Sequence, residues 1–327
     1  MSNKKIAVIS FDHWEYDKHI VSTLLEKGID ATHIKIGGFR HQNLLQRMTN
    51  TFSKVFLNKN PKLKKRQDFI LETLSKIGFQ DQILVINPEL IDLEYHLEIK
   101  KSTNKYIAYL YDSVDRCPVE HLFNGIFDGI FSFDDNDISK YSFKKTNNYI
   151  YFDEKPLDLK KPEFDVFYLA SYDKRLDLLN QISRKLNEIN KTYLFIVVGK
   201  KTWKKSLLNF FNNSNKSIIY RRNRIKQEDI GLYYSKVAVI LDLVRDNQIG
   251  LSFRVFEAMA FQKKLITSNK SIKNYDFYNP NNILIVDKSD LVFDNSFFET
   301  SYEPLPDEIY KKYTLNSWVE NVFELQK

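Results

Sequence analysis

The sequence contains almost no cysteine and no long hydrophobic run. Cys117 is the single cysteine among 327 residues, which excludes an intramolecular disulfide and any cysteine-based zinc cluster. No stretch approaches the roughly 18 consecutive apolar residues of a membrane-spanning helix, and the first apolar run is too short for a secretory signal. Together these absences predict a cytoplasmic protein.

Several phosphate-binding patterns are also missing. The chain has neither the G-x-G-x-x-G loop of dinucleotide-binding oxidoreductases nor the G-x-x-x-x-G-K-[ST] loop of P-loop kinases. The acidic run at 134–137 starts a predicted helix, so it is interpreted as helix capping rather than as a site for a metal-held diphosphate. We therefore expect no metal and no cofactor, with cationic side chains in place of an ion.

Apolar residues and positive charge are abundant instead. Hydrophobic residues make up 43% of the chain, which predicts a folded protein, and the length is sufficient for two domains with separate cores. The net charge of +7 leaves room for an anionic partner, although a Lys- and Asn-rich coding background explains it equally well. No dense basic and aromatic motif of a nucleic-acid-binding module is visible, so no nucleic-acid partner is expected.

Strand and helix signals alternate along the whole chain. This alternation predicts an α/β fold with two doubly wound, Rossmann-like parallel sheets. The predicted domains are residues 1–155 and 156–306, joined by a polar linker at 153–164, and a helix at 307–327 follows them. The predicted strands are 5–10, 31–36, 82–86, 106–111, 129–133, 148–152, 165–170, 193–198, 217–220, 239–243, 264–267 and 282–287. The predicted helices are 17–27, 42–77 with a break near 58–62, 88–100, 119–124, 174–189, 203–212, 226–235, 253–261 and 307–325.

Residues 239–269 carry the most information about function. They predict a buried strand, a polar loop opened by Gly250, a short helix that carries Arg254 and Glu257, and a second strand. Ligands bind at the C-terminal ends of strands in open α/β sheets, and a helix N-terminus there favours anions. This unit is therefore predicted to hold a phosphorylated ligand.

The same segment resembles the donor-binding segment of GT-B glycosyltransferases. The run Glu257-Ala258-Met259-Ala260 matches the family's Glu-Ala-Met/Leu-Ala pattern. The bacterial spore-maturation-type and surface-polysaccharide glycosyltransferases are especially similar, and the matching residues are Gly250, Leu251, Arg254, Phe256, Glu257 and Ala258. The resemblance implies two Rossmann-like domains facing a cleft, a C-terminal helix that can cross back to the first domain, and a nucleotide-sugar donor, with a UDP-sugar favoured.

The resemblance also implies a donor site in the second domain. Arg254 would contact the diphosphate, and Glu257 would accept from the ribose hydroxyls. The alternative is a local ion pair between these two residues. Solvated loops and an N-capped helix remain the alternatives for the other expected donor-binding residues, which are Ser171, Lys174, Arg175, Gly199, Lys200, Tyr220, Arg221, Gly250, Leu251 and Ser252.

One departure from the family concerns the mechanism. Retaining members place a carboxylate eight positions before Glu257, where this chain has Ile249. Possible bases follow two strands of the first domain, namely Asp112, Asp12 and His13. Asp12 can also be a helix cap and His13 a surface residue. We expect an inverting reaction with Asp112, ahead of Asp12, as the base.

The region 52–66 mixes phenylalanines with lysines and predicts either contact with an anionic membrane or a solvated loop. A membrane contact suits a lipid-linked acceptor or a growing surface glycan, such as lipopolysaccharide or capsule, at the inner face of the cell membrane. A noncatalytic two-domain protein that binds a sugar or nucleotide is the rival hypothesis.

Overall fold

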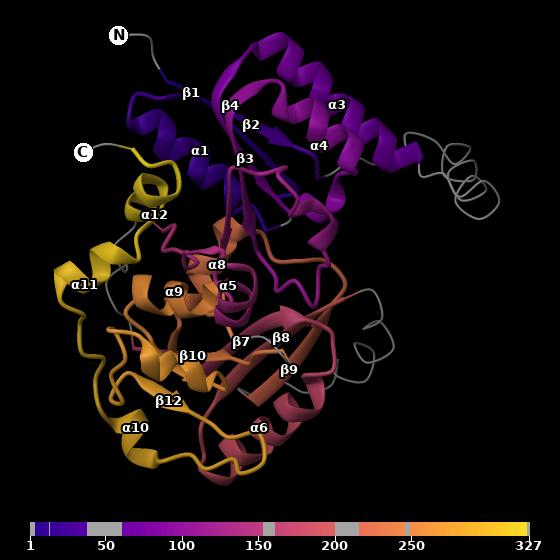
Figure 1. Ribbon diagram of the computed structural model, residues 1–327. Coiled ribbons are helices and arrows are strands. Elements are labelled where there is room, and N and C mark those ends of the chain that lie inside the picture. The colour runs from indigo at the N-terminus through magenta and orange to yellow at the C-terminus, as the bar shows by residue number, and fades with distance from the viewer. Residues whose placement is uncertain are drawn as a thin grey trace. The chain divides into compact units, whose positions relative to one another are not determined.

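The computed structural model describes residues 4–12, 14–37, 61–152, 161–199, 216–245 and 249–325. The chain divides into two compact units (Figure 1). The first contains Met1–Asn147 and Leu315–Lys327, and the second contains Asn148–Thr314. Each unit is built on a six-stranded parallel sheet, so the predicted α/β class with two Rossmann-like domains is confirmed. The expected domain limits at 155 and 306 stay a prediction.

The first unit has the strand order β2-β1-β3-β4-β5-β6, and every neighbouring pair is parallel. The strand order reverses beside β1, because the chain moves from β1 to one neighbour, β2, and then to the other, β3. Such a switch point is where open α/β sheets bind ligands. The strands are β1 (Lys5–Ser10), β2 (Asp30–Lys35), β3 (Gln80–Ile86), β4 (Thr103–Leu110), β5 (Gly129–Ser132) and β6 (Lys144–Lys145).

Helices cover both faces of this sheet. On one face, Ile70 of α3 and Ile99 of α4 pack on inward-facing strand residues such as Val85. On the other face lie α1 and α12, and the Trp318 ring of α12 is 5.2 Å from that of Tyr109. The helices and 3-10 turns are α1 (Asp17–Glu26), α3 (Pro61–Ile77), η1 (Pro88–Leu90), α4 (Leu93–Lys100), η2 (Glu120–Leu122), α5 (Asp135–Tyr141) and α12 (Leu315–Val322).

The second unit has the order β12-β11-β10-β7-β8-β9, again with parallel pairing throughout. Its strands are β7 (Phe164–Ser171), β8 (Tyr193–Val198), β9 (Lys216–Arg221), β10 (Val237–Asp242), β11 (Lys264–Thr267) and β12 (Ile283–Ile285). The sheet separates α6 from α8 and α9 (Figure 1). The helices are α6 (Leu176–Glu188), α8 (Gln227–Tyr234), α9 (Phe253–Ala260), η4 (Lys270–Asn274), α10 (Asn295–Glu299) and α11 (Asp307–Lys312).

Two predicted elements are wrong in the same place. Residues 148–152 do not form a strand, because only Ile150 makes a bridge, to Thr314. The predicted helix 307–325 is interrupted at Tyr313 and Thr314 and forms α11 and α12. The two errors share a cause: Ile150 donates its N–H to the carbonyl of Tyr313 over 2.8 Å, and this pairing holds both segments out of a regular element.

Smaller differences occur elsewhere. The predicted helix 88–100 is divided into η1 and α4 by Ile91 and Asp92, and the predicted helix near 119–124 is the short η2. The predicted helix 203–212, the helical residues 42–60 and most of the predicted linker lie outside the described residues.

Candidate functional site

The C-terminal ends of β7 and β10 bring charged residues together in the second unit. These strands are parallel neighbours, so their C-terminal ends lie at one edge of the sheet. Asp173 and Arg175 follow β7, whereas Asp242 ends β10 and Arg245 follows it. Arg254, in the first turn of α9, joins them through Asp242.

Asp242 fixes Arg254 from within the core. The Asp242 side chain is fully buried, and its Oδ1 accepts from Arg254 Nε at 2.9 Å and from Ser252 Oγ at 2.7 Å. Its Oδ2 accepts from Thr267 Oγ1 at 3.1 Å, so both carboxylate oxygens are satisfied. Burial lowers the pKa of Arg254, but the charge of Asp242 together with smaller contributions from Tyr168, Tyr234 and Glu257 outweighs it and raises the pKa above its usual range. The guanidinium is therefore charged, with one fifth of the side chain exposed.

Asp173 plays the same part for two other arginines. Arg175 donates to both of its oxygens, from Nε over 2.8 Å and from Nη2 over 2.7 Å, and also donates from Nη1 to the Leu243 carbonyl over 2.7 Å. Arg245 Nε lies 3.2 Å from Asp173 Oδ2. Burial raises the pKa of Asp173, but the hydrogen bonds and charge of Arg175 outweigh it and hold the pKa at about 2. Asp173 is therefore ionised throughout the physiological range.

The loop that leads into α9 is held by side-chain amides. Asn269 Nδ2 donates to the carbonyls of Ile249, at 2.8 Å, and Gly250, at 3.2 Å. Asn148 Nδ2 donates to the carbonyl of Leu251 at 2.8 Å. Ser252 is the N-cap residue of α9, and its hydroxyl is directed to Asp242. These contacts place the start of α9 at the edge where the arginines lie, so a helix N-terminus and three guanidinium groups are brought together.

Glu257 lies deeper in the second unit than the sequence alone indicated. Its side chain is buried, and the hydroxyls of Tyr151 and Tyr234 each donate to one of its oxygens at 2.5 Å. The ion pair that the structure gives Arg254 is with Asp242. The ribose contact expected for Glu257 stays a prediction.

The other expected donor-binding residues are spread along the same edge of the sheet. Ser171 is the half-buried last residue of β7, and Lys174 is exposed. Gly199 donates its N–H to the carbonyl of Arg221 over 2.8 Å, which joins the ends of β8 and β9. Half-buried Tyr220 precedes the exposed Arg221 on β9. Lys200 lies outside the described residues, so its expected role stays a prediction.

In the first unit, the two expected carboxylates follow separate strands. Asp112 comes after β4, retains 27% exposure of its side chain, and pairs with Arg116 over 2.5 Å. Asp12 follows β1, has a fully buried side chain, and accepts from the Asp17 N–H at 3.0 Å. Lys35 Nζ lies 3.1 Å from the other oxygen of Asp12. His13 lies outside the described residues.

Three functional candidates were missed by the sequence reading. Asp242 could have been noticed as a charged residue that ends an otherwise apolar run, VAVILD. Arg245 follows three residues later and carries no pattern of its own. Asp17 looks like an ordinary helix-start acid in the sequence, because acidic residues are favoured in the first turn of a helix. Its burial is visible only in the fold.

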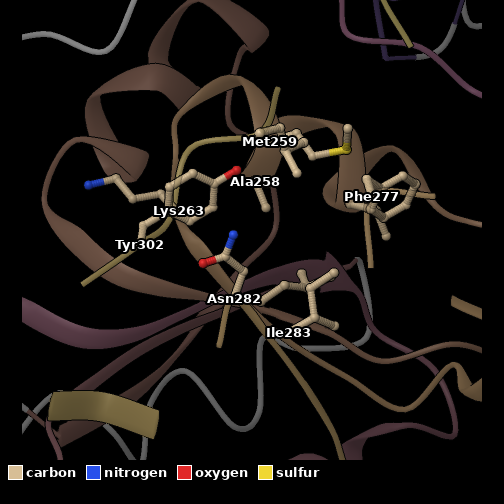
Figure 2. Close-up of a pocket in the computed structure, with 10 residues that line it drawn as sticks. Ala258, Met259, Lys263, Phe277, Asn282, Ile283 and Tyr302 are labelled. Atoms are coloured by element: carbon tan, nitrogen blue, oxygen red, sulfur yellow. The ribbon is translucent and has the colours of Figure 1, made fainter. Parts of the chain in front are cut away.

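A small pocket beneath α9 is a different feature from this edge. Figure 2 shows residues that line it. Its residues Leu265 and Ile283 lie near the N-terminal ends of β11 and β12, whereas the arginines lie at C-terminal strand ends. Its free space of about 20 Å³ is enough for a water molecule but not for a nucleotide. Its lining residues are Val255, Ala258, Met259, Lys263, Leu265, Phe277, Asn282, Ile283, Tyr302 and Leu305.

The described residues lack two features that would point to other functions. They contain no helix that is both long and apolar enough to cross a membrane. They also contain no group of three or more His, Cys, Asp or Glu side chains with the arrangement of a metal site.

Comparison with known proteins gives a likeness of structure. No protein-family model and no curated protein matches the sequence. A solved alpha-glucosyltransferase in complex with UDP and a 13-mer DNA is 13% identical, with 97% of this chain and 92% of that chain covered and a TM-score of 0.61. Starch synthase IV from Arabidopsis thaliana, whose catalytic domain was solved with ADP and acarbose, is 9% identical, with coverage of 99% and 96% and a TM-score of 0.58.

A UDP-N-acetylglucosamine 2-epimerase from Rickettsia bellii is also similar. It is 12% identical, with 98% of this chain and 95% of that chain covered and a TM-score of 0.50. At such identities the comparisons show the fold alone. The chain therefore has a GT-B-like architecture of two Rossmann-like domains, which glycosyltransferases and nucleotide-sugar epimerases share.

Proposed function

We propose that this protein is a glycosyltransferase that moves a sugar from a nucleotide-sugar donor to a hydroxyl acceptor. The observation that carries the proposal is the group formed by Arg175, Arg245 and Arg254 at the C-terminal ends of β7 and β10. Guanidinium groups bind phosphate oxygens through paired, charge-assisted hydrogen bonds, and the start of α9 adds N–H donors. Such a site suits the diphosphate of a nucleotide sugar.

The charge balance of this edge supports an anionic ligand. Three guanidinium groups and two carboxylates, those of Asp173 and Asp242, give these five groups a net charge of +1. The carboxylates also fix the arginines before a ligand arrives, which reduces the entropy lost on binding. In the proposed reaction these arginines stabilise the negative charge that grows on the departing diphosphate.

The rest of the donor site is proposed from the positions of the remaining strand-end residues. Gly250, Leu251 and Ser252 present backbone at the start of α9, while Ser171, Lys174 and Lys200 add hydroxyl and ammonium donors. Tyr220 and Arg221, with the turn at Gly199, offer planar groups for the nucleobase. Glu257 is proposed to accept from the ribose hydroxyls. A UDP-sugar is the favoured donor, and UDP is the nucleotide of the solved alpha-glucosyltransferase complex.

Asp112 is the proposed base on the acceptor side, in an inverting reaction. A general base must come within hydrogen-bond reach of the acceptor hydroxyl, and 27% of the Asp112 side chain is exposed. The side chain of Asp12 is fully buried, which favours Asp112. Proton NMR of the first product should show the anomeric configuration opposite to that of the donor; retention would refute the inverting assignment.

The proposed acceptor is a lipid-linked or surface glycan, handled at the cytoplasmic face of the membrane. The region 52–66 expected to contact anionic lipid lies mostly outside the described residues, but Lys64 and Lys65 are exposed at the start of α3. Each cation near an anionic surface contributes on the order of 1 kcal/mol. Sedimentation with anionic liposomes at low salt should carry the protein down, and a protein that stays wholly in the supernatant would refute the membrane contact.

Epimerisation is the second candidate, because the same architecture occurs in a UDP-N-acetylglucosamine 2-epimerase. A panel of UDP-, GDP-, ADP- and CMP-sugars, with and without oligosaccharide or lipid-linked acceptors, separates the possibilities. A transferase releases the nucleotide in step with glycosylation of the acceptor. An epimerase changes the donor without any acceptor, and a binding protein changes neither.

A further inference from the structure

Two carboxyl groups, those of Asp12 and Asp17, are buried together at the C-terminal end of β1. Their side chains lie in one turn, in which the N–H of Asp17 donates to Asp12 Oδ1 over 3.0 Å. Asp17 is 1% exposed and Asp12 5% exposed. Two ionised carboxylates at such a place would repel each other, and neither could be solvated by water. The arrangement needs either two cations or a proton.

Among the described residues, one ammonium group faces this pair. Lys35, at the end of β2, places Nζ 3.1 Å from Asp12 Oδ2. Its charge is shared with exposed Glu15, whose carboxylate lies 3.9 Å from the same Nζ. His33, also on β2, adds no positive charge at neutral pH, because burial lowers its pKa. In the described part of the chain, the charged groups near the pair therefore balance one carboxylate and leave the second to be neutral.

Hydroxyl groups complete the surroundings of Asp17. Tyr111, which follows β4, donates its hydroxyl to Asp17 Oδ1. Ser10 of β1 also hydrogen-bonds the carboxyl group of Asp17, and its Oγ lies 2.9 Å from His33 Nε2. The contact to Tyr111 ties the N-terminus of α1 to the end of β4. Asp112 is the next residue along the chain.

The titration of Asp17 agrees with this geometry. Burial, followed by the charge of Asp12, raises the pKa of Asp17 to about 7, although the hydrogen bonds from Tyr111 and Ser10 and the charge of Lys35 oppose the change. The turn is also strained, because Asp12 and Glu15 have φ angles of 45° and 63°, in the left-handed region that residues other than glycine rarely adopt. Such a turn persists only while the groups around it hold it in place.

We propose that Asp17 is a positioning residue that works as a neutral acid: it holds the Tyr111 hydroxyl and with it the turn that carries Asp112. When Asp17 ionises, the carboxylates of Asp12 and Asp17 share the ammonium group of Lys35. The turn between Asp12 and Asp17 then opens, and water reaches both carboxylates. The consequence for Asp112 rests on the proposed function. The neutral state of Asp17 does not, so the two claims can be tested separately.

The unfolding temperature measured from about pH 4 to about pH 9 tests the proton on Asp17. The folded-state pKa of Asp17 is raised, so its stabilising contribution is present at low pH, declines as the pH rises, and is lost once the pH passes about 7. Asp17→Asn keeps the shape of the side chain without the titration and should remove this decline. Asp30→Asn, at the exposed start of β2, should keep it. An unchanged decline in Asp17→Asn would overturn the proposal.

Infrared spectra of the wild-type protein keep the test valid if Asp17→Asn does not fold. The carboxylic-acid C=O band should be present at neutral pH and disappear as the pH rises above about 7; its absence at neutral pH would overturn the proposal.

Once transfer is observed, Tyr111→Phe should lower kcat about tenfold with KM for the donor within about twofold. An unchanged kcat would remove the positioning role. Absence of transfer in the wild type would refute the proposed function and leave the stability result standing.

Discussion

The two sheets have opposite chemistry at the same edge. At the ends of β7 and β10, the carboxylates of Asp173 and Asp242 pair with guanidinium groups. At the end of β1, the buried Asp12 and Asp17 face the ammonium group of Lys35, and burial raises the pKa of Asp17 to about 7. We propose an anion site at the first edge and a neutral acid at the second, although both belong to six-stranded parallel sheets.

The pKa values of Asp173 and Asp17 reflect this difference between the two edges. That of Asp173 is about 2, since the charge and hydrogen bonds of Arg175 outweigh the effect of burial. That of Asp17 is about 7, since burial and the charge of Asp12 outweigh its hydrogen bonds. Asp17 is fully buried beside a second carboxyl group, whereas Asp173 is partly exposed beside two arginines, so burial and neighbouring charges together decide which aspartate can act as an acid near neutral pH.

Removal of Asp242 should have the largest effect. Asp242→Ala leaves the Arg254 guanidinium and the hydroxyls of Ser252 and Thr267 without their acceptor, so the free energy of unfolding should fall by about 3–5 kcal/mol in urea denaturation. The matched control is Asp287→Ala, which removes an exposed ion pair with Lys270 and should change stability little. Equal small losses in both variants would show that the buried network is not needed.

We expect protonation of His96, in the first unit, to lower the stability of the protein at acid pH. This imidazole is buried against Tyr106 and the Pro88 carbonyl, and burial lowers its pKa to about 4. Its folded-state pKa is depressed, so the contribution of His96 to the free energy of unfolding is fully present above about pH 6.5. That contribution falls by about 3 kcal/mol as the pH drops towards 4. Asp17 contributes in the opposite direction over nearly the same pH range, so His96→Gln should remove the loss towards pH 4 and leave the decline towards pH 7 assigned to Asp17. An unchanged pH profile in His96→Gln would remove His96 from the account.

Glu257 should give a smaller effect, and one that separates a binding role from packing. Glu257→Gln preserves the shape and most contacts to Tyr151 and Tyr234, but it offers a ribose one strong acceptor fewer. Titration with UDP should show about tenfold weaker binding, or about 1.4 kcal/mol. Lower stability with unchanged UDP affinity would show that Glu257 only supports the fold.

Most of the fold could be predicted from the sequence. β7, β8 and β10 are apolar runs bounded by polar turns, which is the pattern of strands buried on both faces. The break between α11 and α12 could not be predicted, because the local pattern continues through it. Its cause is the contact of Ile150 with Tyr313 and Thr314, which are more than 160 residues further along the chain.

The candidate site likewise contains residues that the local sequence predicts and residues whose role depends on distant contacts. Arg254 and Arg175 were predicted because a family motif and a strand exit mark them in the sequence. The role of Asp242 depends on Ser252, Arg254 and Thr267, which meet it only after folding. Asp17 was missed for a similar reason, since its partner Tyr111 is 94 residues away. Local patterns locate strand ends, whereas the protonation and pairing of the residues there depend on distant contacts.

The most direct test of the central claim is calorimetric titration of the protein with UDP, GDP, ADP and CMP. We predict saturable binding of at least one nucleoside diphosphate, weakened about 10- to 100-fold in Arg254→Ala through loss of a charge-assisted contact. Arg184→Ala, on the exposed face of α6, should bind as the wild type does. Absence of binding for all four nucleotides, or equal affinity in Arg254→Ala and Arg184→Ala, would contradict a donor site at the ends of β7 and β10.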